Sequence, residues 1–274
     1  MTIINQQNKL NFIKMSALGN DFVIFDYRQQ YFSLDSKQIK KISDHKNIGC
    51  DQLIIIKKPN QNNSSKITVA VEMEIFNCDG SLSETCGNAT RCVAGYLFEE
   101  NPNQNIIFIE TLGGILKCQK INQNLISVNM GKAKFLDNLN FDKYVFNCVD
   151  VGNPHAVCFV DKMISNEDLF ILGPQIENHH HFPNKTNVEF AKIINDQLIA
   201  VRVWERGVGE TTACGSGACG VVALAIKNKL VKSSKVFVEF LGGKLQIEYI
   251  NDEIIMIGDY QKIFYGKIDE DFFS

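Results

Sequence analysis

Two cysteines, each followed by glycine and each opening an apolar segment, are the residues best suited to chemistry in this sequence. Cys86 lies in Glu-Thr-Cys-Gly-Asn, and Cys214 lies in Glu-Thr-Thr-Ala-Cys-Gly-Ser-Gly. Each segment predicts a helix that begins at the glycine. The thiol would then face unpaired N–H groups and the positive end of the helix dipole. That position favours thiolate over thiol.

The backbone behind each cysteine predicts a site for an anionic group, because N–H groups at a helix start bind anions. These N–H groups belong to Gly87, Asn88, Gly215 and Ser216. If both helix starts face one ligand, they would hold a single carboxylate from two sides. A thiolate and a thiol on opposite faces of a carbon invert a stereocentre, since one removes a proton and the other returns one. The N–H groups would stabilise the developing carbanion.

The surroundings of the cysteines repeat along the chain, which indicates an internal duplication. Cys86 and Cys214 are 214 − 86 = 128 positions apart. Glu110-Thr-Leu-Gly-Gly and Glu239-Phe-Leu-Gly-Gly are 239 − 110 = 129 apart, and the Gly-Asn pairs at 19 and 152 are 152 − 19 = 133 apart. Two domain-sized copies explain such offsets better than a solenoid.

Each half predicts several short strands and one principal helix. Helices are expected over 36–46, 87–100 and 218–226, the last apolar on every side and therefore buried all round. Strands are expected at 22–25, 53–56, 67–76, 106–109, 115–118 and 125–128. The expected fold class is α+β. It has two pseudo-symmetric domains, each a strongly curved, mostly antiparallel sheet wrapped around a central helix, with the active site in the cleft between them.

The repeat also predicts the domain boundaries. The first domain is expected over 1–131 and the second over 132–259, while the tail 260–274 packs back on the first domain.

Composition excludes several classes of protein. With 45% hydrophobic and 22% charged residues and a net charge of −3, the chain carries no basic surface for nucleic acid or membranes. No apolar run approaches the ~20 residues that span a bilayer, and residues 1–10 lack the apolar core of a signal peptide. We expect a cytoplasmic protein that acts on a small molecule. A homodimer is the expected assembly, although no sequence feature sets the oligomeric state.

Five further cysteines and the run of three histidines are expected to take no part in the chemistry. The chain has nine cysteines and no Cys-x-x-Cys pair, which argues against zinc-ribbon and thioredoxin-like sites. Cys92, Cys118, Cys148, Cys158 and Cys219 are interpreted as buried residues of the core. The run His179–His181 lies in a polar loop and is interpreted as solvated, so no metal site is expected.

No cofactor is expected either. The sequence contains neither a Gly-x-Gly-x-x-Gly dinucleotide fingerprint nor a Walker loop. Motifs alone leave a pyridoxal-binding lysine open.

Taken in order, five segments resemble the diaminopimelate epimerase family. They are Ala17–Val23, Asn77–Ser81, Cys86–Cys92, Gly152–Val157 and Trp204–Gly217. The match spans most of the chain, and its last segment is highly specific. The resemblance implies a cofactor-independent amino-acid epimerase that interconverts LL- and meso-2,6-diaminopimelate in lysine and peptidoglycan precursor biosynthesis.

The resemblance also implies roles for individual residues. Cys86 and Cys214 would be the acid–base pair, with His155 and Glu205 tuning their proton affinities. The α-carboxylate would be held by the backbone of Gly87, Asn88, Gly215 and Ser216. The rest of the substrate would be read by Asn20, Gln52, Asn77, Asn153, Asn187, Glu205 and Arg206. Among these residues, Arg206 would bind the distal carboxylate of the substrate, because an arginine can donate two parallel hydrogen bonds to a carboxylate.

The chain departs from the family pattern at four positions near the motifs. Glu74 replaces a usual arginine, which puts local charge pairing in doubt. Ala89 replaces a glycine and Ser16 a histidine, and Cys78 is an unexpected thiol beside Asn77.

Three alternative functions remain open. A proline or hydroxyproline racemase would share the fold, but Asn77, Asn153, Asn187 and Arg206 together suit a second amino-acid head group, which proline lacks. A cysteine hydrolase or transferase using Cys214 and His155 would leave Cys86 unexplained. A non-catalytic binder would leave both thiols unexplained.

Overall fold

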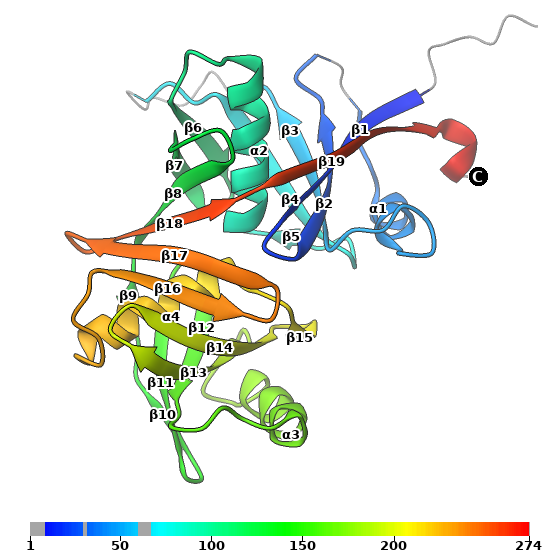
Figure 1. Ribbon diagram of the computed structural model, residues 1–274. Coiled ribbons are helices and arrows are strands. Elements are labelled where there is room, and N and C mark those ends of the chain that lie inside the picture. Colours follow the sequence, from blue (N-terminus) through cyan, green and yellow to red (C-terminus); the bar gives the residue numbers. More distant parts are fainter. Residues whose placement is uncertain (1–8, 30–31, 60–66, 274) are drawn as a thin grey trace, which may run out of the picture. The chain divides into compact units, whose positions relative to one another are not determined.

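The computed structural model describes residues 9–29, 32–59 and 67–273. Residues 1–8, on which the expectation of no signal peptide largely rests, lie outside the described residues. The chain forms two compact units, which comprise residues 1–120 with 260–274, and residues 121–259 (Figure 1). The boundary expected after residue 131 falls inside the strand Leu125–Lys132. This strand belongs to the second unit, because it pairs with Glu253–Asp259.

The first unit is one sheet. Its strands are β1 (Lys9–Ala17), β2 (Asn20–Asp26), β3 (Gln52–Lys57), β4 (Val71–Asn77), β5 (Leu82–Ser83), β6 (Ile106–Thr111), β7 (Gly114–Lys120) and β19 (Gln261–Asp269). They pair in the order β19–β1–β2–β3–β4–β6–β7. β5 and β6 both pair with the edge of β4 that faces away from β3. The last strand of the chain therefore lies beside the first.

The second unit repeats this plan. Its strands are β8 (Leu125–Lys132), β9 (Lys134–Phe135), β10 (Leu139–Phe141), β11 (Tyr144–Asp150), β12 (Pro154–Phe159), β13 (Asn187–Asn195), β14 (Leu198–Glu205), β15 (Gly209–Thr211), β16 (Lys235–Phe240), β17 (Gly243–Ile250) and β18 (Glu253–Asp259). From β11 the order runs β12–β13–β14–β16–β17–β18–β8.

The parallel pairs identify equivalent strands in the two units. β2–β3 and β12–β13 are parallel, as are β4–β6 and β14–β16, whereas the other ladders are antiparallel. β15 and β16 share one edge of β14, as β5 and β6 share one edge of β4. The duplicated, sheet-dominated α+β fold that the sequence predicts is confirmed.

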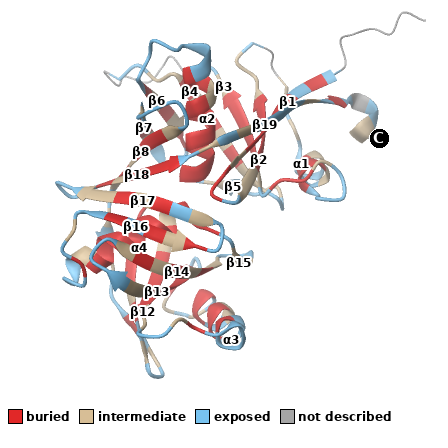
Figure 2. Cartoon of the chain, viewed as in Figure 1, coloured by how far each residue is buried: buried red, intermediate tan, exposed pale blue. Residues whose placement is uncertain are grey.

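One buried helix packs against each sheet: α2 (Gly87–Glu100) in the first unit and α4 (Gly215–Lys227) in the second (Figure 2). Ten of the thirteen residues of α4 are buried, because its sequence has almost no polar face. No helix in the described part of the chain is long and apolar enough to cross a membrane.

A smaller helix covers the other face of each sheet. α1 (Ser36–Ser43) begins at a capping box of Asp35 and Gln38, ends three residues earlier than expected, and packs on β2 and β3. α3 (Asn166–Glu177) packs on β12 and β13 in the same way. The sequence analysis did not predict α3, because Gly173 and Pro174 interrupt its pattern. β4 starts at Val71, four residues later than expected.

Close packing in the first unit gives a testable prediction at Gly95 of α2. A Cβ at this position would lie 2.2 Å from the Tyr260 ring. We expect Gly95→Ala to lower the free energy of unfolding in urea by about 1–3 kcal/mol through overpacking. In a Tyr260→Ala background the same substitution should raise it by up to about 1 kcal/mol, because alanine is the better helix former. Equal losses in both backgrounds would contradict this packing.

Candidate active site

The two cysteines occupy the same structural position in the two units. Cys86 is the N-cap of α2 and Cys214 is the N-cap of α4, both with extended backbone. Sγ of Cys86 accepts from the N–H of Ala89 at 3.5 Å, and Sγ of Cys214 accepts from the N–H of Gly217 at 3.4 Å. A sulfur stands where a hydroxyl, carboxylate or amide oxygen is usual. The following N–H groups belong to the first helical turn, which leaves them without intrahelical partners.

In the first unit, two pairs of amide side chains lie at the ends of the strands. Nδ2 of Asn88 donates to Oδ1 of Asn20 at 2.6 Å, which ties the first turn of α2 to the start of β2. Nε2 of Gln52 donates to Oδ1 of Asn77 at 3.0 Å, because these residues are opposite each other in the β3–β4 ladder. The structure thus brings Asn20 together with Asn88, and Gln52 together with Asn77.

An acidic pair supports the same strand ends. Asp21 and Asp51 each accept the other's backbone N–H at 2.9 Å, and Lys14 forms an ion pair with Asp21 at 2.5 Å. Burial, together with the charge of Asp21, raises the pKa of Asp51. Asp21, Asp51 and His45 also place possible metal-ligand atoms within 4.8 Å of one another. Since the Lys14 ammonium already balances Asp21, we assign these residues a structural role.

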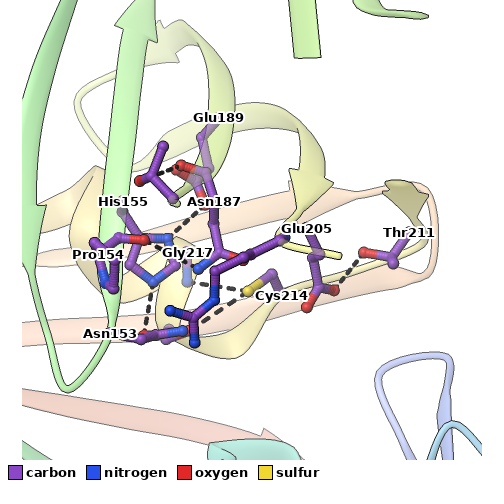
Figure 3. A network of polar contacts seen from close by, with 12 residues as sticks. Asn153, Pro154, His155, Asn187, Glu189, Glu205, Thr211, Cys214 and Gly217 are labelled. Carbon is purple, nitrogen blue, oxygen red and sulfur yellow. Dashed lines mark hydrogen bonds and ion pairs between the residues drawn. The ribbon is translucent and has the colours of Figure 1, made fainter. Parts of the chain in front are cut away.

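In the second unit, His155 lies at the centre of a buried network (Figure 3). Its Nδ1 is 2.6 Å from Oε1 of Glu189, and its Nε2 is 2.9 Å from Oδ1 of Asn153. His155 and Glu189 are both fully buried. Sequence reasoning predicted His155 and Asn153 but missed Glu189. Its signal is an acid within the apolar run Asn187-Val-Glu-Phe-Ala.

The turn after β14 carries Glu205 and Arg206. Glu205 accepts a short hydrogen bond from Oγ1 of Thr211, across the β14–β15 pair. Oδ1 of Asn187 accepts from the N–H of Arg206 at 3.0 Å, and Nδ2 of Asn187 donates to the carbonyl of Pro154 at 3.0 Å. Asn187 therefore joins the loop of Asn153 to that of Arg206. The exposed Arg206 guanidinium donates to the carbonyl of Asn184 at 3.2 Å.

A second buried acid that sequence reasoning missed holds this turn from α3. Oε2 of Glu177 accepts from the Trp204 indole at 2.8 Å, and Oε1 accepts from the N–H of Gly207 at 3.0 Å. Gly173 packs against the same indole: a Cβ on Gly173 would lie 2.5 Å from the Trp204 ring. Glu177 thus fixes both sides of the Glu205-Arg206 segment.

The environment of Cys214 differs from the sequence expectation. Burial raises the pKa of its thiol well above 9.0, and the carboxylates of Glu205 and Glu189 raise it further. Hydrogen bonds from Ser216 and from the N–H of Gly217 lower the pKa but do not prevail. The expected preference for thiolate is therefore wrong for Cys214 in this structure, because burial and two anions outweigh the helix start.

The departures from the family motifs have local explanations. Glu74 forms an ion pair with Lys57 at 2.5 Å across the β3–β4 ladder, so its charge is balanced. Ala89 is buried, and its N–H binds the Cys86 sulfur. Ser16 lies opposite Asp21 in the β1–β2 ladder, and Cys78 is exposed.

Comparison with known proteins identifies the family. The profile described as diaminopimelate epimerase matches residues 12–136 and 147–263. The chain belongs to the diaminopimelate epimerase family. The diaminopimelate epimerase of Pelagibacter ubique is 42% identical over 254 residues, which cover 85% of this chain and 89% of the relative. That of Acetivibrio thermocellus is 38% identical over 95% of this chain and 99% of the relative. The resemblance found in the sequence is confirmed, and the protein is an isomerase.

Solved structures support the fold alone. A hydroxyproline epimerase from Agrobacterium vitis matches with a TM-score of 0.71 at 12% identity, over 98% of this chain and 94% of that one. A PhzF-family phenazine biosynthesis protein from Bacillus anthracis matches with a TM-score of 0.69 at 15% identity, over 96% and 99%. Both structures match nearly the whole of this chain, so they share its duplicated architecture.

The raised pKa of Cys214 gives a prediction that needs no substrate. Alkylation of Cys214 by iodoacetamide, followed by peptide mass spectrometry, should still accelerate above pH 9.0, where an ordinary thiol is half ionised. Glu205→Gln removes one nearby anion, so the midpoint of that pH profile should move to lower pH. Ser216→Ala, which removes a hydrogen bond that lowers the pKa, should move it the other way. Identical midpoints in all three proteins would contradict this electrostatic account.

Proposed function

We propose that this protein interconverts LL- and meso-2,6-diaminopimelate by a cofactor-independent mechanism with two thiols. The observation that carries the proposal is the pair of N-cap cysteines at equivalent positions of two duplicated units. A single nucleophilic cysteine would need no second copy, whereas inversion of a stereocentre needs a base and an acid. The names of the relatives supply the substrate.

In the proposed reaction, a thiolate removes the α-proton while the opposite thiol donates a proton to the other face. The reverse reaction exchanges these roles, so the enzyme returns to a form with one thiol and one thiolate. The two thiols must therefore approach one carbon from opposite sides. The raised pKa of Cys214 supports Cys214 as the acid and Cys86 as the base in the form described here.

The substrate groups are assigned to the site as follows. We propose that the N–H groups of Gly87, Asn88, Gly215 and Ser216 hold the α-carboxylate and stabilise the carbanion. Arg206 would bind the distal carboxylate, which its exposed guanidinium supports. The amides of Asn20, Gln52, Asn77, Asn153 and Asn187, with the Glu205 carboxylate, would bind the remaining polar groups. His155 and Glu205 would tune the thiols.

Deuterium exchange tests the reaction. We expect wild-type protein in D₂O to exchange the α-hydrogen of diaminopimelate and to epimerise it. Cys86→Ser and Cys214→Ser should each lose about 10²–10⁴-fold in epimerisation, the usual contribution of a general acid or base. Proline and hydroxyproline serve as comparison substrates. Exchange of proline without exchange of diaminopimelate would overturn the substrate assignment, and full epimerisation by either serine variant would overturn the mechanism.

We further propose that the protein is a cytoplasmic homodimer. All nine cysteines are free thiols, which suits a reducing compartment. β19 pairs with β1 along one edge, and its Ile263, Phe264 and Tyr265 are 48%, 47% and 63% exposed. Consecutive exposed apolar side chains on a strand at the edge of a sheet suit a self-complementary contact.

Sedimentation equilibrium tests the dimer. We expect a dimeric wild type and a monomeric Tyr265→Lys variant, because a lysine charge would be buried in the contact. Leu112→Lys, which changes an equally exposed apolar residue in the β6–β7 turn, is the matched control and should remain dimeric. A monomeric wild type, or dissociation of both variants, would refute the β19 surface.

A further inference from the structure

The contact between His155 and Glu189 is the most deeply buried polar contact of the second unit's site. Both side chains are 0% exposed. Asn187 and Glu189 point to the α4 side of β13, whereas Val188 and Phe190 point into the core beneath α3. His155 lies beside Asn187 in the parallel β12–β13 ladder, so its ring reaches Glu189 diagonally.

The hydrogen-bond partners of His155 fit a proton on each ring nitrogen. An ionised Glu189 side chain only accepts, so Nδ1 would donate to it across the 2.6 Å contact. The carbonyl end of the Asn153 amide faces Nε2 at 2.9 Å, so Nε2 would donate as well. A histidine with two donors is an imidazolium. The Nδ1 contact is also as short as a charge-assisted hydrogen bond.

The N-terminus of α4 explains how the Glu189 side chain can be buried. A Cβ on Gly217 would lie 2.7 Å from Oε1 of Glu189, so the first turn of the helix packs directly on the acid. The positive end of the helix dipole stabilises an anion there. Gly220, one turn further, lies against His155 in the same way, with its Cβ position 3.6 Å from the histidine Cβ.

We propose that Glu189 is a positioning residue that keeps His155 doubly protonated at the start of α4, beside Cys214. The imidazolium then offsets part of the Glu189 charge beside Cys214, so the thiolate form of Cys214 is more accessible when it must act as the base. The kinetic part of this inference rests on the proposed function, whereas the protonation state of His155 does not. Other ionisable groups that interact with this part of the site include Glu205 of β14, Cys214 itself and Cys148 of β11.

Side-chain nitrogen NMR of the uniformly ¹⁵N-labelled protein tests the protonation state directly. We expect both ring nitrogens of His155 to carry protons in the wild type, with His155→Gln used to assign the signal among the five histidines. In Glu189→Gln the ring should become neutral. The glutamine amide donates to Nδ1, while Nε2–H still donates to Asn153. Glu177→Gln, which removes another buried carboxylate of the same unit, should leave the His155 signals unchanged.

A double-mutant cycle tests whether Glu189 acts through His155. We expect Glu189→Gln to lower kcat for diaminopimelate at least about tenfold with little change in KM, since it removes the imidazolium beside the reacting thiol rather than a substrate contact. In a His155→Gln background, Glu189→Gln should cost no further activity, because coupled residues are not additive.

Two outcomes would overturn the inference. The first is a wild-type His155 with an unprotonated ring nitrogen, and the second is a Glu189→Gln loss of the same size in both backgrounds. If the wild-type protein does not epimerise diaminopimelate, the proposed function fails, but the NMR measurement still decides the charge of His155.

Discussion

The position of each thiol depends on one constraint: a helix that is buried on every side must start at a fixed point of the sheet that surrounds it. Because eleven of the fourteen residues of α2 and ten of the thirteen residues of α4 are buried, neither helix can rotate or slide without exposing apolar surface. Their N-caps are therefore fixed, and so are Cys86 and Cys214. The glycines of α4 allow this closeness, since side chains at Gly217 and Gly220 would collide with Glu189 and Val149.

Duplication fixed the geometry of the two thiols but not their electrostatics. In the parallel ladders His155 lies opposite Asn187, and Phe22 lies opposite Gln52. Phe22 is therefore the counterpart of His155, and Ile54 is the counterpart of Glu189. Both counterparts are apolar and fully buried. At these two positions one copy thus has a buried histidine and carboxylate and the other has hydrocarbon, which suits two thiols that begin each turnover in different protonation states.

Much of the fold could be predicted from the sequence, because repeated motifs and apolar helices leave periodic signals. The helix starts at Cys86 and Cys214 and the Gly-Asn loops are examples. The charge state of Cys214 could not be predicted, since it depends on Glu189 and Glu205, which approach from other strands. Glu177 was missed for the same reason: its contacts with Trp204 and Gly207 span about thirty residues of sequence. α3 was missed because Pro174 hides a helix whose stability comes from packing on the sheet.

The pairing of β1 with β19 affects the order in which the chain can fold during synthesis. β1 begins at Lys9, and its partner strand ends at Asp269. Residues 121–259, by contrast, form a continuous unit. On the ribosome the second unit can therefore close as soon as its own residues emerge. The first unit must keep one edge of β1 unpaired until β19 has been translated, so the unit whose synthesis begins first is completed after the other.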